Sequence, residues 1–128
     1  MSEFQFLTLA EVVAIHSDQI GRYGGEAGIR DMALLESAIA QPEASFGGQY
    51  LHRDLHEMAA AYAFHLCQNH PFFDGNKRVA IASAFVFLRM NDTRIVDPDS
   101  TLIQIMLDVA QGRINKAALA SVLKKLSI

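Results

Sequence analysis

One segment of nine residues, positions 70–78, brings together side chains that could carry out chemistry; it reads HPFFDGNKR. Histidine is the side chain that titrates nearest to neutral pH, so His70 can serve as a general base toward a hydroxyl. Asp74 offers carboxylate oxygens, which suit Mg²⁺ bridging protein and phosphate. Lys77 and Arg78 add two positive charges just after Gly75. The combination predicts a site for a nucleotide with phosphate groups.

The same segment runs into the start of an expected helix at residues 76–90. The first turn of a helix has unpaired backbone N–H groups and the positive end of the dipole, so it binds anions. Gly75 lets the backbone approach a phosphate closely. Cations such as Lys77 and Arg78 are unfavourable at this end of a helix. Their presence is understandable if an anion binds there and offsets the cost.

Each of these residues also has a plain structural interpretation. His70 could end the preceding helix, and Asp74 could be the N-cap of the next one, since aspartate is a preferred cap. Lys77 and Arg78 could belong to a solvated first turn. The Asn76 side chain could make only local hydrogen bonds.

The elements that must position this segment are helical. Hydrophobic periodicity, capping residues and stop signals predict six helices, at about 9–20, 29–40, 55–69, 76–90, 100–110 and 116–126. The stretch from 79 to 88 is apolar on nearly every side, so we expect that helix to lie in the middle. The expected fold class is all-α: a compact bundle of about six helices around a central buried helix.

Two segments of this expected bundle are not helical. A short strand near residues 93–96 is the most β-structure that we expect. Residues 41–53 form the longest irregular segment, and long loops in small domains are often functional. Two histidines, His52 and His56, lie near the end of this segment, and their spacing of four residues would put them on one helix face. Because His52 lies in the loop and not in a helix, we expect a surface pair and no metal site.

Composition limits the possible classes of protein. The chain has 128 residues, 51% hydrophobic and 20% charged, which predicts a single domain over residues 1–128. The net charge of −3 argues against direct nucleic-acid binding. A membrane span needs about 20 apolar residues, more than the longest apolar stretch provides, so we expect no membrane association. The first residues lack the pattern of a secretory signal, so the expected location is cytoplasmic.

The segment HPFFDGNKR resembles the signature of the Fic/Doc family, HPFx(D/E)GN(G/K)R. It is most similar to the branch of death-on-curing (Doc-like) toxins, which belong to toxin–antitoxin modules. Other stretches also resemble that branch, so that the resemblance covers most of the chain: YGG at 23–25, GIRD at 28–31, LLESAI at 34–39 and FVFLRMN at 85–91.

The resemblance implies a role for each residue of the segment. It implies that His70 is the catalytic base on a target hydroxyl and that Asp74 holds Mg²⁺ together with the phosphates of ATP. Pro71 and Phe72 would anchor the loop. The phosphate- and ATP-binding residues would be Gly75, Asn76, Lys77 and Arg78.

Two positions differ from the family members that transfer AMP. Those members have glycine where this chain has Lys77, and a second arginine where it has Ile81. In Doc-like proteins, lysine at the first position accompanies a reversed nucleotide and transfer of the γ-phosphate. The expected activity is therefore that of a Mg-ATP-dependent protein kinase. The alternatives are an AMP transferase with the same fold and a non-catalytic homologue that only binds an antitoxin or a nucleotide.

The resemblance also implies two protein partners. Many Fic proteins carry an inhibitory helix with an S/T-x-x-x-E-G/N motif, and this sequence has no match to it. Inhibition would then come from a cognate antitoxin, through a helical segment that lies in an apolar groove. The expected substrate is a translation protein, elongation factor Tu, and the expected outcome is translation arrest.

Overall fold

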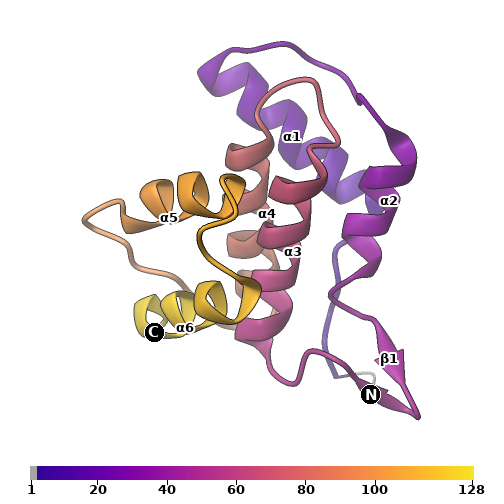
Figure 1. Cartoon of the computed structure of the whole chain (residues 1–128), viewed down its shortest axis with the longest axis vertical. Coiled ribbons are helices and arrows are strands. Elements are labelled where there is room, and N and C mark those ends of the chain that lie inside the picture. The colour runs from indigo at the N-terminus through magenta and orange to yellow at the C-terminus, as the bar shows by residue number, and fades with distance from the viewer. Residues whose placement is uncertain (1–2) are drawn as a thin grey trace.

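Six helices make up most of the protein, in a computed structural model that describes residues 3–128 (Figure 1). The only β-sheet in this part of the chain is a two-stranded hairpin. In chain order the elements are α1 (Leu9–Tyr23), α2 (Met32–Ala40), β1 (Ser45–Phe46), β2 (Gln49–Tyr50), α3 (Leu55–Asn69), α4 (Asn76–Met90), α5 (Thr101–Ala110) and α6 (Lys116–Leu126). The all-α class predicted from the sequence is confirmed.

The first two helices differ in their limits from the prediction. The capping box of Thr8 and Glu11 starts α1, as expected, but the helix continues through Gly21 and ends at Tyr23. It stops where Gly24 takes a positive φ of 80°, because that conformation cannot continue a right-handed helix. The second helix begins later than predicted, at Met32, because the carboxylate of Asp31 accepts a hydrogen bond from the N–H of Leu34 and so caps it.

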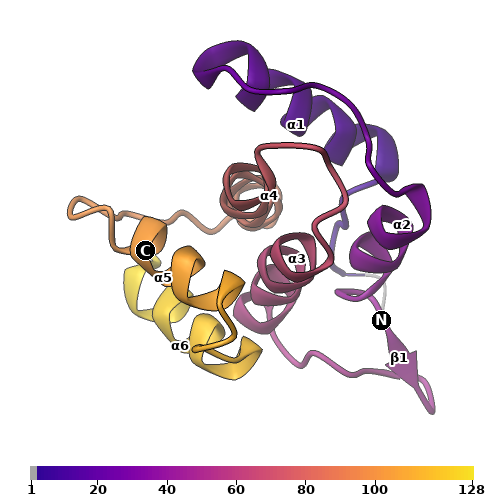
Figure 2. The ribbon, with the colours of Figure 1, turned by 45° about the horizontal axis from the view of Figure 1, so that its top comes forward.

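The helix at the centre of the bundle is α3, which corrects the prediction that residues 76–90 hold that place. Figure 2 shows α3 between α2, α4 and α6, and it also contacts α5. Its buried positions include four alanines, which let neighbouring helices come close: Ala59, Ala60, Ala61 and Ala63. The α4 helix contacts α1, α3 and α5 but leaves Val86 and Arg89 on the surface.

The irregular segment after α2 contains the hairpin, which the sequence did not predict. Ser45 pairs with Tyr50 and Phe46 with Gln49, around a turn made by Gly47 and Gly48. Both glycines have positive φ, as a tight hairpin turn requires. The strand expected near residues 93–96 is only an isolated bridge between Ile95 and Ser127.

The buried apolar side chains form one cluster to which all six helices contribute. Tyr62 and Phe87, from the two long helices α3 and α4, are fully buried in it, with their rings 5.1 Å apart. The hydroxyl of Tyr62 accepts a hydrogen bond from the backbone N–H of Leu7 at 2.8 Å, which ties the segment before α1 to the core. The bundle thus gives α3 and α4 a rigid position relative to each other.

Candidate functional site

The loop between α3 and α4, residues 70–75, holds most of the predicted site; we call it the motif loop. His70 ends α3 in the left-handed conformation, with φ 49° and ψ 53°. Pro71 disfavours the right-handed helical conformation at the residue before it, so α3 cannot continue through His70. The residue is exposed, and so the imidazole belongs to the surface of the molecule at this end of α3.

Asp74 lies at the other end of the motif loop and is held by backbone donors. One carboxylate oxygen accepts from the N–H of Glu26 at 3.2 Å and the other from the N–H of Gly75 at 2.8 Å. These two bonds, helped by the charge of Arg78, lower the pKa of Asp74. The side chain is exposed and ionised at neutral pH, so it presents a negative charge to solvent beside the start of α4.

The N-terminus of α4 lacks a side-chain cap, which sets it apart from the other helices of residues 3–128. Thr8, Asp31, Asp54 and Asn115 cap α1, α2, α3 and α6. The first N–H groups of α5 are taken by the carboxylate of Asp97. At α4 the N-cap is Gly75, with φ 75° and no side chain, and the first turn contains no acidic residue. The backbone donors at this end of α4 are therefore available to an anion.

The inner side of the motif loop is packed by three residues. Phe72 is fully buried, and the ring of His16 stacks on it at 3.7 Å between centroids. Nε2 of His16 donates to the carbonyl of Asp74 at 2.7 Å. The side chain of Asn76 is buried and bonds both the N–H and the carbonyl of Phe72. What Asn76 can offer a phosphate is therefore its backbone N–H and not its amide group.

The two cations in the first turn of α4 differ in their surroundings. Arg78 is half-buried and donates to the carbonyl of Gly24 at 3.0 Å and that of Gln19 at 3.4 Å. Its guanidinium also lies 6.0 Å from the ring centroid of Tyr23. Lys77 is exposed, and among the described residues it has no carboxylate within salt-bridge distance. Lys77 is thus the freer of the two charges.

A second segment, residues 24–31, lies along the motif loop and braces it; we call it the bracing segment. Backbone bonds join the two chains at several points: the N–H groups of Arg30 and Asp31 to the carbonyl of Pro71, and that of Phe73 to the carbonyl of Gly28. The fit is tight at Gly25, where a Cβ would lie 2.6 Å from Oδ2 of Asp74. The sequence showed only a glycine-rich loop here, since nothing local reveals which distant segment it meets.

The guanidinium of Arg30 completes this contact, and sequence reasoning missed it. Its Nε donates to the carbonyl of His70 at 2.7 Å and its terminal nitrogen to that of Asn69 at 3.1 Å. Nothing in the sequence singles out His16 either, although its ring contacts Phe72 and Asp74 of the motif loop. The only available signal was the GIRD stretch, noted for its resemblance to the Doc branch.

Asp74 fits a magnesium ion that is held mainly by phosphate oxygens. No group of three or more His, Cys, Asp or Glu side chains that could hold a metal occurs in residues 3–128. Magnesium keeps several water ligands and commonly uses one or two carboxylates together with substrate phosphates. The single ionised carboxylate of Asp74, next to the uncapped helix end, suits this arrangement.

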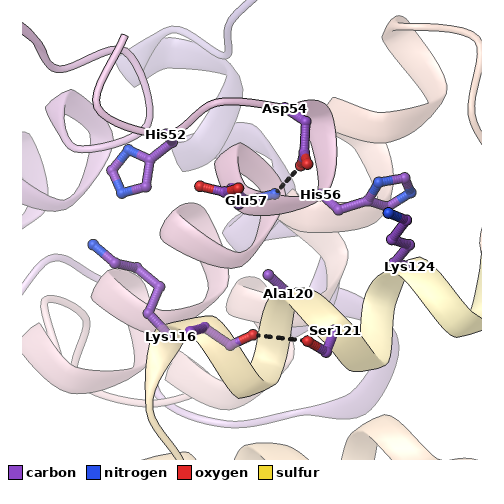
Figure 3. Close-up of a pocket in the computed structure, with 9 residues that line it drawn as sticks. His52, Asp54, His56, Glu57, Lys116, Ala120, Ser121 and Lys124 are labelled. Atoms are coloured by element: carbon purple, nitrogen blue, oxygen red, sulfur yellow. Dashed lines mark hydrogen bonds between the residues drawn. The ribbon is translucent and has the colours of Figure 1, made fainter.

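A pocket of about 390 Å³ lies at the opposite end of α3, between its N-terminus and α6 (Figure 3). It is lined by His52, Asp54, His56, Glu57, Lys116, Ala117, Ala120, Ser121 and Lys124. The prediction that His52 and His56 form a surface pair is wrong for His52, which is buried with Nδ1 lacking a partner in the described structure. Nζ of Lys116, one of the lining residues, lies 3.0 Å from Nε2 of His65. None of the predicted site residues lines this pocket.

A third feature is an apolar groove of about 430 Å³ along the C-terminal half of α4. Its apolar lining comes from Phe85, Val86, Met90 and Ile95, and Arg89 and Arg94 also line it.

No helix within residues 3–128 has both the length and the apolar character that crossing a membrane requires.

Comparison with known proteins agrees with this geometry. The model of the Fic/DOC family matches residues 6–88, which include the bracing segment, the motif loop and most of α4. The chain is 34% identical over 116 residues to "Protein kinase doc" of Escherichia phage P1, covering 91% of this chain and 90% of the relative. It is 41% identical over 73 residues to "Toxin Doc" of Mycolicibacterium smegmatis, covering 57% of this chain and 56% of that protein. The match over more than half of its length shows that this chain belongs to the Fic/DOC family.

Proposed function

We propose that the protein is the toxin of a toxin–antitoxin module and acts as a Mg-ATP-dependent protein kinase. It would transfer the γ-phosphate of ATP to a hydroxyl of a translation factor, expected to be elongation factor Tu, and so arrest translation. The names of the two relatives, one a protein kinase and the other a toxin, support this proposal.

The observation that carries the proposal is the uncapped N-terminus of α4 between the ionised Asp74 and the exposed Lys77. The free N–H groups and the positive end of the helix favour an anion with several oxygens, such as a polyphosphate. A carboxylate at the edge of such a site would repel the phosphates unless a cation lies between them. The arrangement therefore favours a nucleotide that arrives with Mg²⁺.

Each residue of the site would have its own role in the transfer reaction. The hydroxyl oxygen of the target attacks the γ-phosphorus, the bond from that phosphorus to the bridging oxygen breaks, and ADP leaves. The imidazole of His70 takes the hydroxyl proton. Asp74 would hold Mg²⁺, which when bound offsets charge on the phosphates. Lys77 and the N–H groups of the first turn of α4 would hold the phosphate oxygens.

The alternative with the same fold is transfer of AMP, and two residues favour the kinase. Lys77 places a bulky cation where the AMP-transferring pattern has glycine. At the position of that pattern's second arginine stands Ile81, which is half-buried against the core and offers no charge. ATP labelled at the γ-position should therefore label the target, and label arriving from the α-position instead would contradict the kinase hypothesis.

Growth of cells that express the chain from a tightly repressed promoter tests the toxin activity itself. We expect the wild-type chain to stop protein synthesis and His70→Ala to leave it unaffected at equal amounts of folded protein. His56→Ala is the matched control, because His56 lines the pocket at the far end of α3. Equal toxicity of wild type and His70→Ala would point instead to a non-catalytic partner.

We also propose that the groove on α4 receives a helical segment of the cognate antitoxin. Four of the residues that line the groove are apolar, and neither Arg89 nor Arg94 has a carboxylate within salt-bridge distance in the described residues. An amphipathic helix with acidic residues beside its apolar face would complement both features.

Charge reversal tests where the antitoxin binds. Arg89→Glu should weaken antitoxin binding by tenfold or more, whereas Arg22→Glu, an exposed arginine at the end of α1, should leave it unchanged. Calorimetry on the two purified proteins measures both affinities. Equal loss in both variants would mean that the effect comes from overall charge and not from the groove.

A further inference from the structure

The C-terminal end of α3 lacks the usual means of satisfying its last carbonyl groups. A helix commonly ends with backbone N–H groups of the following residues turning back to these carbonyls. Here the residue after His70 is Pro71, which has no N–H to give. The carbonyls of Asn69 and His70 are instead bonded by one side chain from another part of the chain, Arg30.

The backbone at His70 also needs support. A left-handed conformation is unfavourable for any residue with a Cβ, and such strain persists only where the surroundings enforce it. The φ and ψ angles of His70 determine the direction of its Cα–Cβ bond, and therefore where the imidazole can lie. Holding the carbonyl of His70 restrains the ψ angle of that residue directly.

We propose that Arg30 is a positioning residue for His70: its guanidinium caps α3 and fixes the left-handed backbone from which the imidazole projects. This inference rests on the proposed function in taking His70 as the base. The backbone bonds from Arg30 and Asp31 to the carbonyl of Pro71 hold the next peptide, so the side chain completes a clamp on three successive carbonyls.

Stability and positioning are expected to depend on Arg30 to different extents. The residue is exposed, and a cation near the end of a helix contributes little to stability when it is exposed to solvent. A catalytic group that moves by about 1 Å can lose about 100-fold in rate. Loss of the guanidinium should therefore reduce the transfer rate by about 10-fold to 100-fold while the fold persists.

The test uses NMR on the full-length chain, because it reads the conformation of His70 without any activity. A residue with positive φ gives a strong NOE between its own Hα and amide proton. We expect this NOE in the wild-type chain, and we expect Arg30→Ala to weaken it and to shift the imidazole resonances of His70. Arg30→Lys, which can keep one of the two bonds, should lie between them. Arg22→Ala is the matched control, since that arginine contacts only Asp18 by hydrogen bond and salt bridge.

Two further measurements separate positioning from a general loss of structure. Binding of Mg-ATP by Arg30→Ala should equal that of the wild type, because Asp74 and the start of α4 are unchanged. Guanidinium ion added at millimolar concentration should restore the NOE and part of the lost activity in Arg30→Ala, and should do nothing for His70→Ala.

The inference and the proposed function can fail separately. An unchanged NOE and unchanged imidazole resonances in Arg30→Ala would overturn the inference, whether or not the chain is toxic. If the NMR changes occur but the wild-type chain does not arrest translation, the positioning of His70 stands and the proposed function fails.

Discussion

At the scale of single residues, Asp74 joins local and distant parts of the chain. Its carboxylate is bonded by the next residue, Gly75, and by Glu26, which lies far away in the sequence. The sequence predicted that Asp74 places a carboxylate beside the start of α4. It could not predict the hydrogen bond from Glu26, because that bond comes from the backbone N–H of Glu26 and depends on how residues 24–31 are folded.

Removing the charge of Asp74 while keeping its shape tests its role toward Mg²⁺. Asp74→Asn has one acceptor oxygen and can keep one of the two backbone bonds, from Glu26 or from Gly75, so we expect the fold to be retained. Affinity for ATP should fall by about tenfold or more when Mg²⁺ is present, and should stay equal or rise when it is chelated, because one repulsive charge is gone. Calorimetric titration with and without EDTA distinguishes these cases. An equal loss in both conditions would speak against metal binding by Asp74.

Asn76 provides the second prediction at this scale. Its buried amide bonds both the N–H and the carbonyl of Phe72, so Asn76→Ala leaves two backbone groups without partners. Each unsatisfied buried group costs about 1 to 3 kcal/mol, so the free energy of unfolding should fall by about 2 to 6 kcal/mol. Urea denaturation measures the change. Gln104→Ala, on the exposed side of α5, should change it by less than about 0.5 kcal/mol.

At the scale of elements, the fit between the bracing segment and the motif loop depends on Gly25. Its φ is 120°, and a Cβ there would lie 2.6 Å from Oδ2 of Asp74. Gly25→Ala should therefore displace Asp74 as well as strain the backbone, and should abolish Mg-dependent ATP binding. The neighbouring Gly24 is the control, because its φ is also positive, at 80°, but a Cβ there would meet no atom within 4 Å.

Gly24→Ala should carry the cost of the backbone strain alone, about 1 to 3 kcal/mol because φ 80° with ψ 176° lies in a region almost confined to glycine, and should keep ATP binding. Comparing the two variants by urea denaturation and by ATP titration separates strain from displacement. Equal ATP binding by both would mean that the close approach at Gly25 is not needed for the site.

The contact between α3 and α6 predicts how stability depends on pH. Burial, together with the charge of Lys116, lowers the pKa of His65 to about 4. In the unfolded chain a histidine titrates near about 6.5. Between these values the unfolded chain binds more protons than the folded one, so stability rises with pH through this window and is lost as pH falls. Burial also lowers the pKa of His52, which acts in the same direction.

Urea denaturation at about pH 4.5 and about pH 7 measures this dependence. Because His65 is only half-buried, we expect the difference it causes to be smaller than the full linkage value of about 3 kcal/mol. His65→Gln can still accept the bond from Lys116 but does not titrate there, so the difference should shrink. An unchanged difference in His65→Gln would assign the effect to His52 or to carboxylates.

Most helices could be predicted from the sequence, and the features that the prediction missed have physical causes. The limits of α3 and α6 follow from the sequence because a local cap, Asp54 or Asn115, and helical periodicity agree there. The hairpin at 45–50 was not predicted, because its two strands have two residues each and no alternating pattern. The central place of α3 was missed because its alanines read as weakly apolar in sequence, although they are what lets other helices pack closely around it.

At the scale of the whole molecule, one continuous apolar cluster connects the six helices. We therefore expect the chain to unfold as one cooperative unit, as a single domain should. Far-UV circular dichroism reports the helices, and tyrosine fluorescence reports the core, since the sequence has no tryptophan and Tyr62 is buried. The two urea transitions should coincide. A separate early transition in the dichroism would show that part of the bundle, such as α5 and α6, unfolds independently.

The left-handed backbone at His70 has a consequence for how such a protein changes under selection. Glycine adopts this conformation without the cost that any other residue incurs. Replacing His70 by glycine would thus remove the proposed base and relieve the strain in one step, leaving a chain that folds as well as before or better. A population harmed by the activity could discard it through this position without losing the folded protein, its groove on α4 or any partner that recognises that groove.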